Sequence, residues 1–316
     1  MKKLKVKFVD FWVDMDKPEG NFFYDLLARK YDVEFSDDPE LVFYSCYGSE
    51  YLKYKCTRIF YCAENKRPDF SRCDYAMTFD YLADERHLRL PLWALYYRKD
   101  WIYQEDPDKR FEDWANRKHF CCIIVSNATA VERVEFYRKL NARRTVDSAG
   151  QWNNTIGTTL LPGTENKLQF IRDYRFVISF ENSSNPGYAT EKIIEPLMAG
   201  CIPIYWGDPE IHLDFNMGRV IAVRNSEDYD AVIDRIVDME NDKSLAKSLL
   251  SGPIFPDDKL PVYLEDDYIS KKLFEWIGRS EKRKFRGVGS EIRSRVRYYS
   301  AICKSGLITI KNKIVQ

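Results

Sequence analysis

The sequence predicts an α/β protein with two domains, each built around a parallel β-sheet. Short apolar runs alternate with stretches of helical periodicity along most of the chain. Because parallel strands need a crossover connection, usually a helix, this alternation is typical of parallel sheets. A length of 316 residues exceeds the usual size of one hydrophobic core, which favours two domains. A ligand crevice is then expected at the carboxyl edges of the sheets.

The apolar runs predict nine strands, and the helical patterns between them predict six helices. Near the N-terminus, Leu4, Val6 and Phe8 alternate with Lys5 and Lys7, which indicates a strand and not the apolar core of a signal peptide. The expected strands are 4–12, 32–35, 41–45, 58–62, 75–79, 120–125, 176–180, 202–206 and 220–223. The expected helices are 21–30, 130–142, 166–172, 190–199, 226–240 and 244–250.

A polar segment, 98–118, and a glycine-rich segment, 147–164, indicate a domain boundary in the middle of the chain. We therefore expect an N-terminal domain over 1–150, a C-terminal domain over 151–265, and a helix with a basic tail over 266–316.

Charge is distributed unevenly, although the net charge of the chain is zero. The last part, 281–316, has ten Lys and Arg against two Glu. Such a tail is either solvated or a basic, partly apolar segment that rests on an anionic membrane surface. Nucleic acid is disfavoured as a partner, because no recognition module accompanies the charge.

The composition predicts a cytoplasmic protein, peripheral at the inner membrane face if the tail binds there. No run of about 18 apolar residues is present, so no membrane-spanning helix is expected. The eight cysteines form no C-x-x-C pair, and several lie inside apolar runs. We therefore expect most of them to be buried thiols of a reducing compartment, and no zinc site.

The most informative stretch runs from the expected strand 176–180 through a loop of Asn, Ser, Pro and Gly into a helix. Thr190 suits the N-cap of this helix and Gly200 its C′ position. A helix N-terminus offers free N–H groups and about half a positive charge, which favours phosphate. Lys192 adds a full charge, whereas Glu191 can accept hydrogen bonds from sugar hydroxyls. The pair predicts a nucleotide-sugar ligand; the alternative is an exposed first turn that these residues only cap.

Two further residues are candidates for the same chemistry. After the expected strand 120–125, Thr129 and Glu132 have the spacing of a capping box, which places Arg133 on the first turn of the next helix. An arginine fork matches phosphate oxygens well. Glu64 follows an apolar strand, at a position suited to a general base. Taken alone, an arginine such as Arg133 is more often a surface residue, and a carboxylate such as Glu64 is more often a solvated loop residue.

Other signals are weaker. The Asp-Met-Asp at 14–16 has the D-x-D form of some metal sites, but it follows the first strand without a supporting pattern, so we interpret it as a loop. His87, His119 and His212 are isolated and are expected to be structural or solvated. Dinucleotide, P-loop and G-x-S-x-G signatures are missing, which disfavours dehydrogenases, kinases and ordinary hydrolases.

Three blocks of the sequence, in order and at compatible spacing, resemble the α1,3/α1,4-fucosyltransferases, bacterial members in particular. They are FYCAENKRPDF with CDYAMTFD and RLPLW, then VSN with ERVEFYRKL, then FENSSNPGYATEKIIEPLMAGCIPIYWG, which resembles the donor-binding signature. The resemblance covers residues 4–255. The sequence departs from the family over 98–117, where no pattern matches, and at its end, where the heptad repeats of some bacterial members are absent.

The resemblance implies the GT-B arrangement, in which two Rossmann-like domains face each other across a cleft, the acceptor side first and the donor side second. It implies inverting transfer of L-fucose from GDP-β-L-fucose to a GlcNAc or glucose hydroxyl, α1,3 or α1,4, of a glycan such as a lipopolysaccharide O-antigen or a capsule oligosaccharide. By resemblance, Glu64 is the general base, and Arg133 and Lys192 contact the diphosphate. Further contacts with GDP-fucose are implied for Asn182, Tyr188 and Glu191. No cofactor or metal is expected, since GDP-fucose is a substrate.

Two other functions stay open from the residues alone. A related enzyme could use a different GDP-sugar, because nothing in the sequence reads the methyl group of fucose directly. A non-catalytic protein could bind a nucleotide-sugar or carbohydrate without transfer. The combination of Glu64 with Arg133 and Lys192 argues against the binder, since binding alone needs no base.

Overall fold

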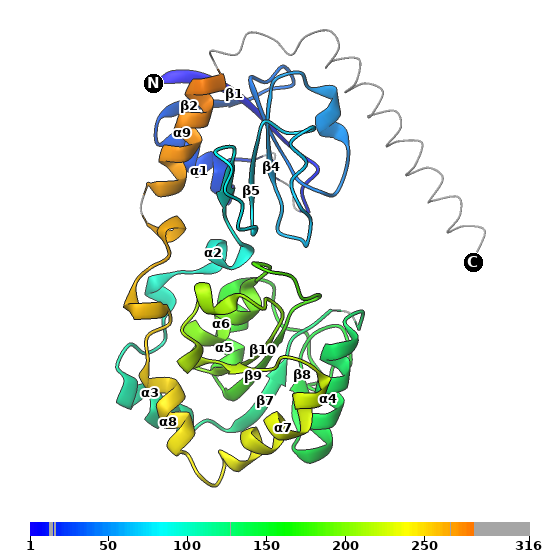
Figure 1. The fold of residues 1–316 in the computed structure, drawn as a ribbon, viewed down its shortest axis with the longest axis vertical. Helices are drawn as coiled ribbons and strands as arrows, with labels where there is room; N and C mark the ends of the chain where they lie inside the picture. Colours follow the sequence, from blue (N-terminus) through cyan, green and yellow to red (C-terminus); the bar gives the residue numbers. More distant parts are fainter. Residues whose placement is uncertain (13–14, 16, 127, 266, 281–316) are drawn as a thin grey trace, which may run out of the picture. The chain divides into compact units, whose positions relative to one another are not determined.

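The computed structural model describes residues 1–12, 15, 17–126, 128–265 and 267–280 (Figure 1). The chain forms two compact units. The first contains Met1–Leu90 together with the C-terminal part from Glu265, and the second contains Pro91–Leu264. Each unit has its own parallel sheet, so the predicted α/β class is confirmed.

The first unit contains a six-stranded sheet in which every neighbouring pair of strands is parallel. In sheet order its strands are β2 (Tyr31–Phe35), β1 (Lys2–Val9), β3 (Leu41–Tyr44), β4 (Thr57–Tyr61), β5 (Tyr75–Thr78) and β6 (His87–Arg89). The helix α1 (Phe22–Ala28) connects β1 to β2, and α9 (Tyr268–Ser280) packs beside it (Figure 1). Trp276 of α9 stacks on Tyr75 at a centroid distance of 4.7 Å, which anchors this late helix to the first sheet.

The second unit contains a five-stranded parallel sheet. Its strands in sheet order are β11 (Ile221–Ala222), β10 (Ile202–Trp206), β9 (Tyr174–Phe180), β7 (His119–Ile123) and β8 (Val146–Ser148). Its helices are α2 (Leu92–Tyr96), α3 (Pro107–Ala115), α4 (Val131–Arg143), α5 (Thr164–Ile171), α6 (Glu191–Met198), α7 (Tyr229–Asp238) and α8 (Ser244–Ser251). The helices α4, α7 and α8 bury apolar side chains with alternate residues of β9 and β10 in one core. The helices α5 and α6 lie on the other side of this sheet from α4 and α7 (Figure 1).

The predicted elements recur with bounds that differ by a few residues, and β10 has the predicted bounds. The strand β1 ends at Val9 instead of residue 12 because Asp10 takes a left-handed backbone conformation, with φ of 63°. The carboxylate of Asp10 accepts hydrogen bonds from the N–H groups of Glu50 and Tyr51 at 3.0 Å, which holds this turn. The short strands β6 and β8 and the helices α2 and α3 were not predicted.

The domain boundary expected at residue 150 was wrong. The strand β7 pairs with β9, with Cys121 opposite Phe176, and β8 pairs with β7, so both belong to the second sheet. The polar segment that suggested a linker contains α3, whose N-cap Asp106 accepts hydrogen bonds from the N–H groups of Asp108 and Lys109. The chain therefore divides after Leu90.

Some expectations lie outside the described residues. These are the basic tail over 281–316 and the aspartates of the Asp-Met-Asp stretch. No helix in the described part of the chain is long and apolar enough to cross a membrane. His87, expected to be structural or solvated, is buried, and its Nε2 lies 2.9 Å from the hydroxyl oxygen of Thr78.

Candidate functional site

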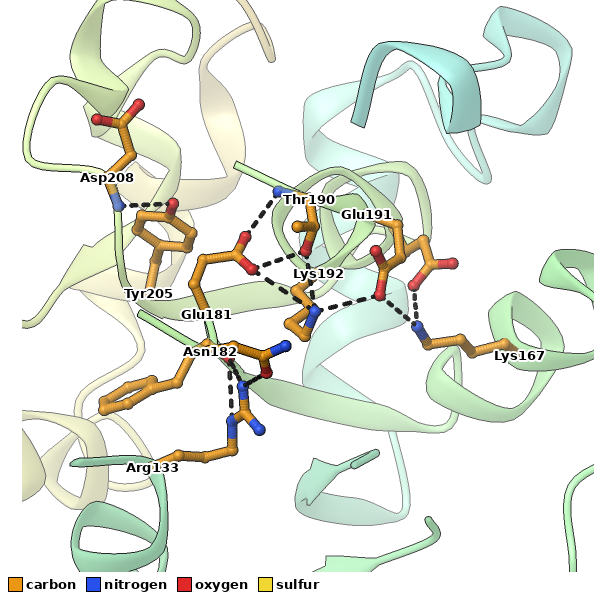
Figure 2. A network of polar contacts seen from close by, with 11 residues as sticks. Arg133, Lys167, Glu181, Asn182, Thr190, Glu191, Lys192, Tyr205 and Asp208 are labelled. Atoms are coloured by element: carbon orange, nitrogen blue, oxygen red, sulfur yellow. Dashed lines mark hydrogen bonds and ion pairs between the residues drawn. The ribbon is translucent and has the colours of Figure 1, made fainter. Parts of the chain in front are cut away.

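A buried carboxylate organises the carboxyl edge of the second sheet (Figure 2). Glu181 follows β9 directly and is completely buried. One of its oxygens accepts the backbone N–H of Thr190 at 2.7 Å, and the other accepts the Thr190 hydroxyl at 2.7 Å. The loop between these two residues is therefore closed by two hydrogen bonds to a single carboxylate. Burial raises the pKa of Glu181, although the charge of Lys192 opposes the shift.

Thr190 occupies the N-cap of α6, as predicted, but it does not cap in the expected way. Its hydroxyl donates to Glu181 and accepts no hydrogen bond from a backbone N–H group of the first turn. The first-turn N–H groups of α6 are thus left without a side-chain cap from Thr190. The prediction for the other end is confirmed, since Gly200 follows the C-cap Ala199 with φ of 68°, a conformation that favours glycine.

Lys192, the second residue of α6, holds its ammonium group among three oxygens. Its Nζ lies 2.9 Å from the Thr190 hydroxyl, 3.4 Å from Oε1 of Glu191 and 3.5 Å from Oε2 of Glu181. Burial alone would lower the pKa of Lys192, but the Glu191 and Glu181 carboxylates raise it above its ordinary value. The group is therefore fully charged at neutral pH.

Glu191, the first residue of α6, lies between two lysines. Its Oε1 is 3.4 Å from Lys192 and 3.8 Å from Lys167 of α5, which also forms an ion pair with the buried Glu195. Burial opposes ionisation of Glu191, yet the charges of Lys192 and Lys167 hold its pKa at about 2. The edge of the sheet thus presents a permanently ionised carboxylate and a permanently charged ammonium side by side.

Arg133 reaches the same edge from the first turn of α4. It is 2% exposed, and its Nε and Nη2 donate to the carbonyl oxygen of Phe180 at 3.1 and 2.7 Å. Its Nη2 also donates to Oδ1 of Asn182 at 2.7 Å. The remaining nitrogen, Nη1, makes no hydrogen bond with any described residue. Burial lowers the pKa of Arg133, although the nearby Glu181 opposes the shift.

The capping box expected at Thr129 and Glu132 was wrong. The helix α4 begins at Val131, with Ala130 at the N-cap and no side-chain cap. The position of Arg133 on the first turn is nevertheless correct. Its burial was not expected and follows from the two hydrogen bonds to Phe180, which the sequence pattern does not show.

The loop 182–189 is also anchored at its far side. Oδ1 of Asp208, just past β10, accepts the N–H of Gly187 at 2.7 Å, and the N–H of Asp208 donates to the Tyr205 hydroxyl at 3.0 Å. Gly207 has φ of 159°, and a Cβ there would lie 2.5 Å from Cγ of Glu181. Only glycine therefore fits beside the buried carboxylate.

The structure brings together four of the six predicted site residues. Arg133, Asn182, Glu191 and Lys192 belong to one network of polar contacts (Figure 2). Tyr188 lies in the loop that the network anchors, but it is buried at 2% exposure, so its contact with a donor stays a prediction.

Glu64 belongs to the first unit. It is half-buried in the loop after β4, and its Oε1 accepts the hydroxyl of Tyr47 at 2.8 Å. The thiol of Cys62 lies 3.4 Å from the carbonyl oxygen of Glu64. One carboxylate oxygen of Glu64 is thus held by Tyr47, and the backbone of the loop is held from the end of β4.

Sequence reasoning did not assign roles to Glu181, Asp208 or Lys167. Two of these had a readable signal, since Glu181 and Asp208 are carboxylates at the ends of apolar strands. Lys167 gave no signal, because its partners are brought to it by the packing of α5 on α6. No group of three or more His, Cys, Asp or Glu that could hold a metal ion was found among the described residues.

The second unit presents a lysine and an arginine beside helix N-termini, at the carboxyl edge of a parallel sheet. This arrangement is typical of the class of proteins that bind phosphate-bearing nucleotides. Two family models match consecutive parts of the chain. The model of the alpha-(1,3)-fucosyltransferase FucT N-terminal domain matches residues 6–96, and that of glycosyltransferase family 10 (fucosyltransferase) C-term matches residues 114–249. The chain belongs to glycosyltransferase family 10, the fucosyltransferases. The junction between the two models lies close to the division after Leu90.

Individual relatives agree with this assignment. An alpha-(1,3)-fucosyltransferase FucT of Helicobacter pylori is 29% identical over 287 residues, which cover 78% of this chain and 59% of that protein. An alpha-(1,3)-fucosyltransferase B of Drosophila melanogaster is 35% identical over 82 residues, 26% of this chain and 18% of that protein. The chain thus spans 59% of the length of the first relative and 18% of the length of the second.

Solved structures share the fold. A crystal structure of an alpha1,3-fucosyltransferase has 26% identity and a TM-score of 0.72, covering 90% of this chain and 91% of that chain. A crystal structure of alpha1,3-fucosyltransferase with GDP-fucose has 24% identity and a TM-score of 0.71, covering 90% and 93%. These similarities confirm the fold predicted from the sequence.

Proposed function

We propose that the protein transfers L-fucose from GDP-β-L-fucose to a hydroxyl of a GlcNAc or glucose unit, in α1,3 or α1,4 linkage. The observation that supports this most is the charged Lys192 held beside the ionised Glu191 at the start of α6, in a chain of the fucosyltransferase family. One relative of known structure is described as bound to GDP-fucose.

The diphosphate of the donor binds at the carboxyl edge of the second sheet. Lys192 supplies an ammonium group, Arg133 supplies Nη1, and the first turn of α6 supplies N–H groups that Thr190 does not cap. As the glycosyl bond breaks, negative charge builds on the bridging oxygen, and fixed cations there lower the barrier. Lys192 needs no proton uptake before it acts, because it is already charged.

The sugar ring develops positive charge in an oxocarbenium-like transition state. Glu191, with a pKa of about 2, is ionised throughout the physiological range and favours this charge. Asn182 is exposed beside Arg133 and serves as a further polar contact for the donor.

Glu64 acts as the general base. Its carboxylate takes the proton of the acceptor hydroxyl, whose oxygen attacks the anomeric carbon as GDP departs from the opposite face. A single displacement of this kind inverts the configuration. Tyr47 supports the role, because its hydroxyl orients one carboxylate oxygen of Glu64 and leaves the other for the acceptor.

The proposal extends to the acceptor class and the setting, with the family assignment as support. A glycan such as a lipopolysaccharide O-antigen or a capsule oligosaccharide supplies the hydroxyl, and no metal ion is required. The basic segment 281–316 provides contact with an anionic membrane surface. Deleting it should lower binding to vesicles with anionic lipids more than it lowers turnover of a soluble oligosaccharide.

The decisive experiment measures GDP release from GDP-fucose and from GDP-mannose, each with an array of defined oligosaccharides and with added EDTA. Turnover that needs GDP-fucose and an acceptor, and that survives EDTA, is the expected result. Turnover only with another GDP-sugar would assign a different donor. Binding of GDP without transfer to any glycan would make the protein a binder and refute the proposal.

A further inference from the structure

Two cysteines face each other at the carboxyl edge of the first sheet. The strands β3 and β4 are parallel, with Tyr44 opposite Phe60. Cys46 follows Tyr44 by two residues, and Cys62 follows Phe60 by two residues. Both lie just past the ends of β3 and β4, and continued alternation of side chains would place them on the same face as that pair. Cys46 and Cys62 indeed pack in the apolar cluster that contains Tyr44 and Phe60.

The spacing suits a disulfide. Neighbouring strands lie about 4.8 Å apart, and the Cα atoms of disulfide-bonded cysteines lie about 4.4–6.8 Å apart. Both cysteines belong to one packed cluster, and each has the largest influence on the pKa of the other. Both cysteines are free in the structure.

The two thiols differ in exposure and acidity. Cys46 is half-buried and reachable from solvent, whereas Cys62 is 1% exposed. The hydrogen bond from the Cys62 thiol lowers the pKa of Cys46 to about 7, while the same contact and burial raise the pKa of Cys62. A thiolate that is accessible and acidic is the reactive form of cysteine. Cys46 is therefore the attacking thiol, and Cys62 is the partner that would resolve an oxidised Cys46.

Both cysteines adjoin the groups that hold Glu64. Tyr47, the residue after Cys46, donates to the carboxylate of Glu64 at 2.8 Å. The thiol of Cys62 lies 3.4 Å from the backbone carbonyl oxygen of Glu64. A covalent bond between the two sulfur atoms would remove the second contact and shift the chain that carries Tyr47.

We propose that Cys46 and Cys62 are a reversible modification site that hydrogen peroxide converts to a disulfide. The Cys46 thiolate attacks the peroxide, so that an S–O bond forms, the O–O bond breaks, and the departing hydroxide takes a proton to become water. The sulfur of Cys62 then attacks the sulfenic acid of Cys46 and loses its proton. The S–S bond forms, the S–O bond breaks, and a second water leaves. The two thiols lose two electrons, and the peroxide gains them.

The proposal has a consequence for turnover, which rests on the proposed role of Glu64. Formation of the disulfide displaces the base and lowers transfer by about 10²-fold, the effect of misplacing a catalytic group by about 1 Å. Binding of GDP is unchanged, because its site belongs to the second unit. A dithiol reductant such as dithiothreitol restores transfer.

The chemical test uses the full chain. Protein treated with hydrogen peroxide is alkylated at its remaining thiols, digested and mapped by tandem mass spectrometry. The expected product is a peptide pair joined through Cys46 and Cys62, lighter by two hydrogen atoms and separated by dithiothreitol. Cys46→Ser should leave Cys62 reduced under the same treatment. Cys56→Ser is the matched control, since Cys56 is half-buried against the same cluster, and this variant should still form the disulfide.

The outcomes separate the two proposals. Absence of the Cys46–Cys62 peptide, or oxidation of Cys46 and Cys56 at equal rates, would overturn the modification site whatever the enzyme does. If the disulfide forms and the rate of transfer equals that of the protein before oxidation, the pair does not act on Glu64. If the reduced protein shows no transfer with any donor, the proposed function fails, but the peptide map still decides the thiol chemistry.

Discussion

Nζ of Lys192 lies 3.5 Å from Oε2 of Glu181, a carboxylate that is completely buried behind it. Lys192 is the group that is proposed to contact the diphosphate. Of its two carboxylate partners, Glu181 is held inside the protein. Removing one partner of a buried ion pair leaves an uncompensated charge, which is strongly destabilising. The pair therefore couples the position of Lys192 to the integrity of the loop 182–189.

Replacing Lys192 by alanine should remove a cation from the leaving diphosphate. We expect a loss of about 3 kcal/mol in transition-state stabilisation, close to 10²-fold in kcat/KM. Steady-state release of GDP from GDP-fucose measures it. Lys139→Ala is the control, because Lys139 pairs with Asp230 on an exposed surface. A kcat/KM for Lys192→Ala equal to that of the control would remove Lys192 from the site.

Replacing Glu181 by glutamine should weaken the loop that carries the site. The amide can accept one hydrogen bond from Thr190, but its NH2 group replaces the oxygen that accepts from the Thr190 hydroxyl and pairs with Lys192, so both of these contacts are lost. A buried donor without an acceptor costs about 1–3 kcal/mol. Urea unfolding should show a loss of this size, whereas Glu227→Gln at an exposed position should show almost none. Equal stability of the two variants would contradict the proposed closure of the loop.

Arg133 should be sensitive even to a charge-conserving change. Arg133→Lys keeps the charge but loses the paired hydrogen bonds to Phe180 and the bond to Asn182. We expect weaker GDP binding together with a loss of about 1–3 kcal/mol in unfolding free energy. Calorimetric titration with GDP and urea unfolding measure the two effects. Arg138→Lys, exposed on the same helix, should leave both unchanged; an intact GDP affinity in Arg133→Lys would argue that the arginine is only structural.

Glu64→Gln separates the base from donor binding. Loss of the carboxylate should slow transfer by about 10²–10⁴-fold, the usual contribution of general-base catalysis. The affinity for GDP should stay the same, because the proposed diphosphate contacts belong to the second unit. Glu19→Gln, an exposed position of the first unit, serves as the control. Loss of GDP binding in Glu64→Gln would instead place this carboxylate among the donor contacts.

The first unit should lose stability in mild acid. Burial, helped by the charge of Arg89, lowers the pKa of His87 from 6.5 to about 4. Between these values the unfolded chain binds a proton that the folded protein does not, so stability falls as the pH drops from 6.5 to 4. The contribution is complete above pH 6.5 and amounts to about 3 kcal/mol.

Unfolding free energies measured across this interval test the role of His87. His87→Gln should show a flatter dependence on pH than the wild type, whereas His212→Gln, at an exposed histidine, should show the wild-type slope. If His87→Gln keeps the full slope, another group causes the acid sensitivity.

Much of the fold could be predicted because it is encoded locally. The apolar run of β10 and the glycine after α6 specify a strand and a helix end through the backbone preferences of their own residues. The short strands β6 and β8, three residues each, escaped prediction because so few residues carry no periodicity. The helix α3 escaped because its charged surface resembles a loop.

The site was only partly predictable. The adjacent Glu191 and Lys192, Arg133 on a helix start and Glu64 after a strand could be proposed from residue type and spacing. The partners of Lys192 and Arg133 could not, because Glu181 and Phe180 meet them through contacts that span many residues of chain.

The α/β class, most strands and helices, and the family could be predicted from the amino-acid sequence, because these depend on local periodicity and on contiguous motifs. Three features are visible only in the folded protein: β7 joins the second sheet, Thr190 turns its hydroxyl to Glu181, and Cys46 packs in one cluster with Cys62. Each of these depends on which distant segments pair. Strand pairing and burial are settled by the free energy of the whole folded chain, so no short window of sequence contains them.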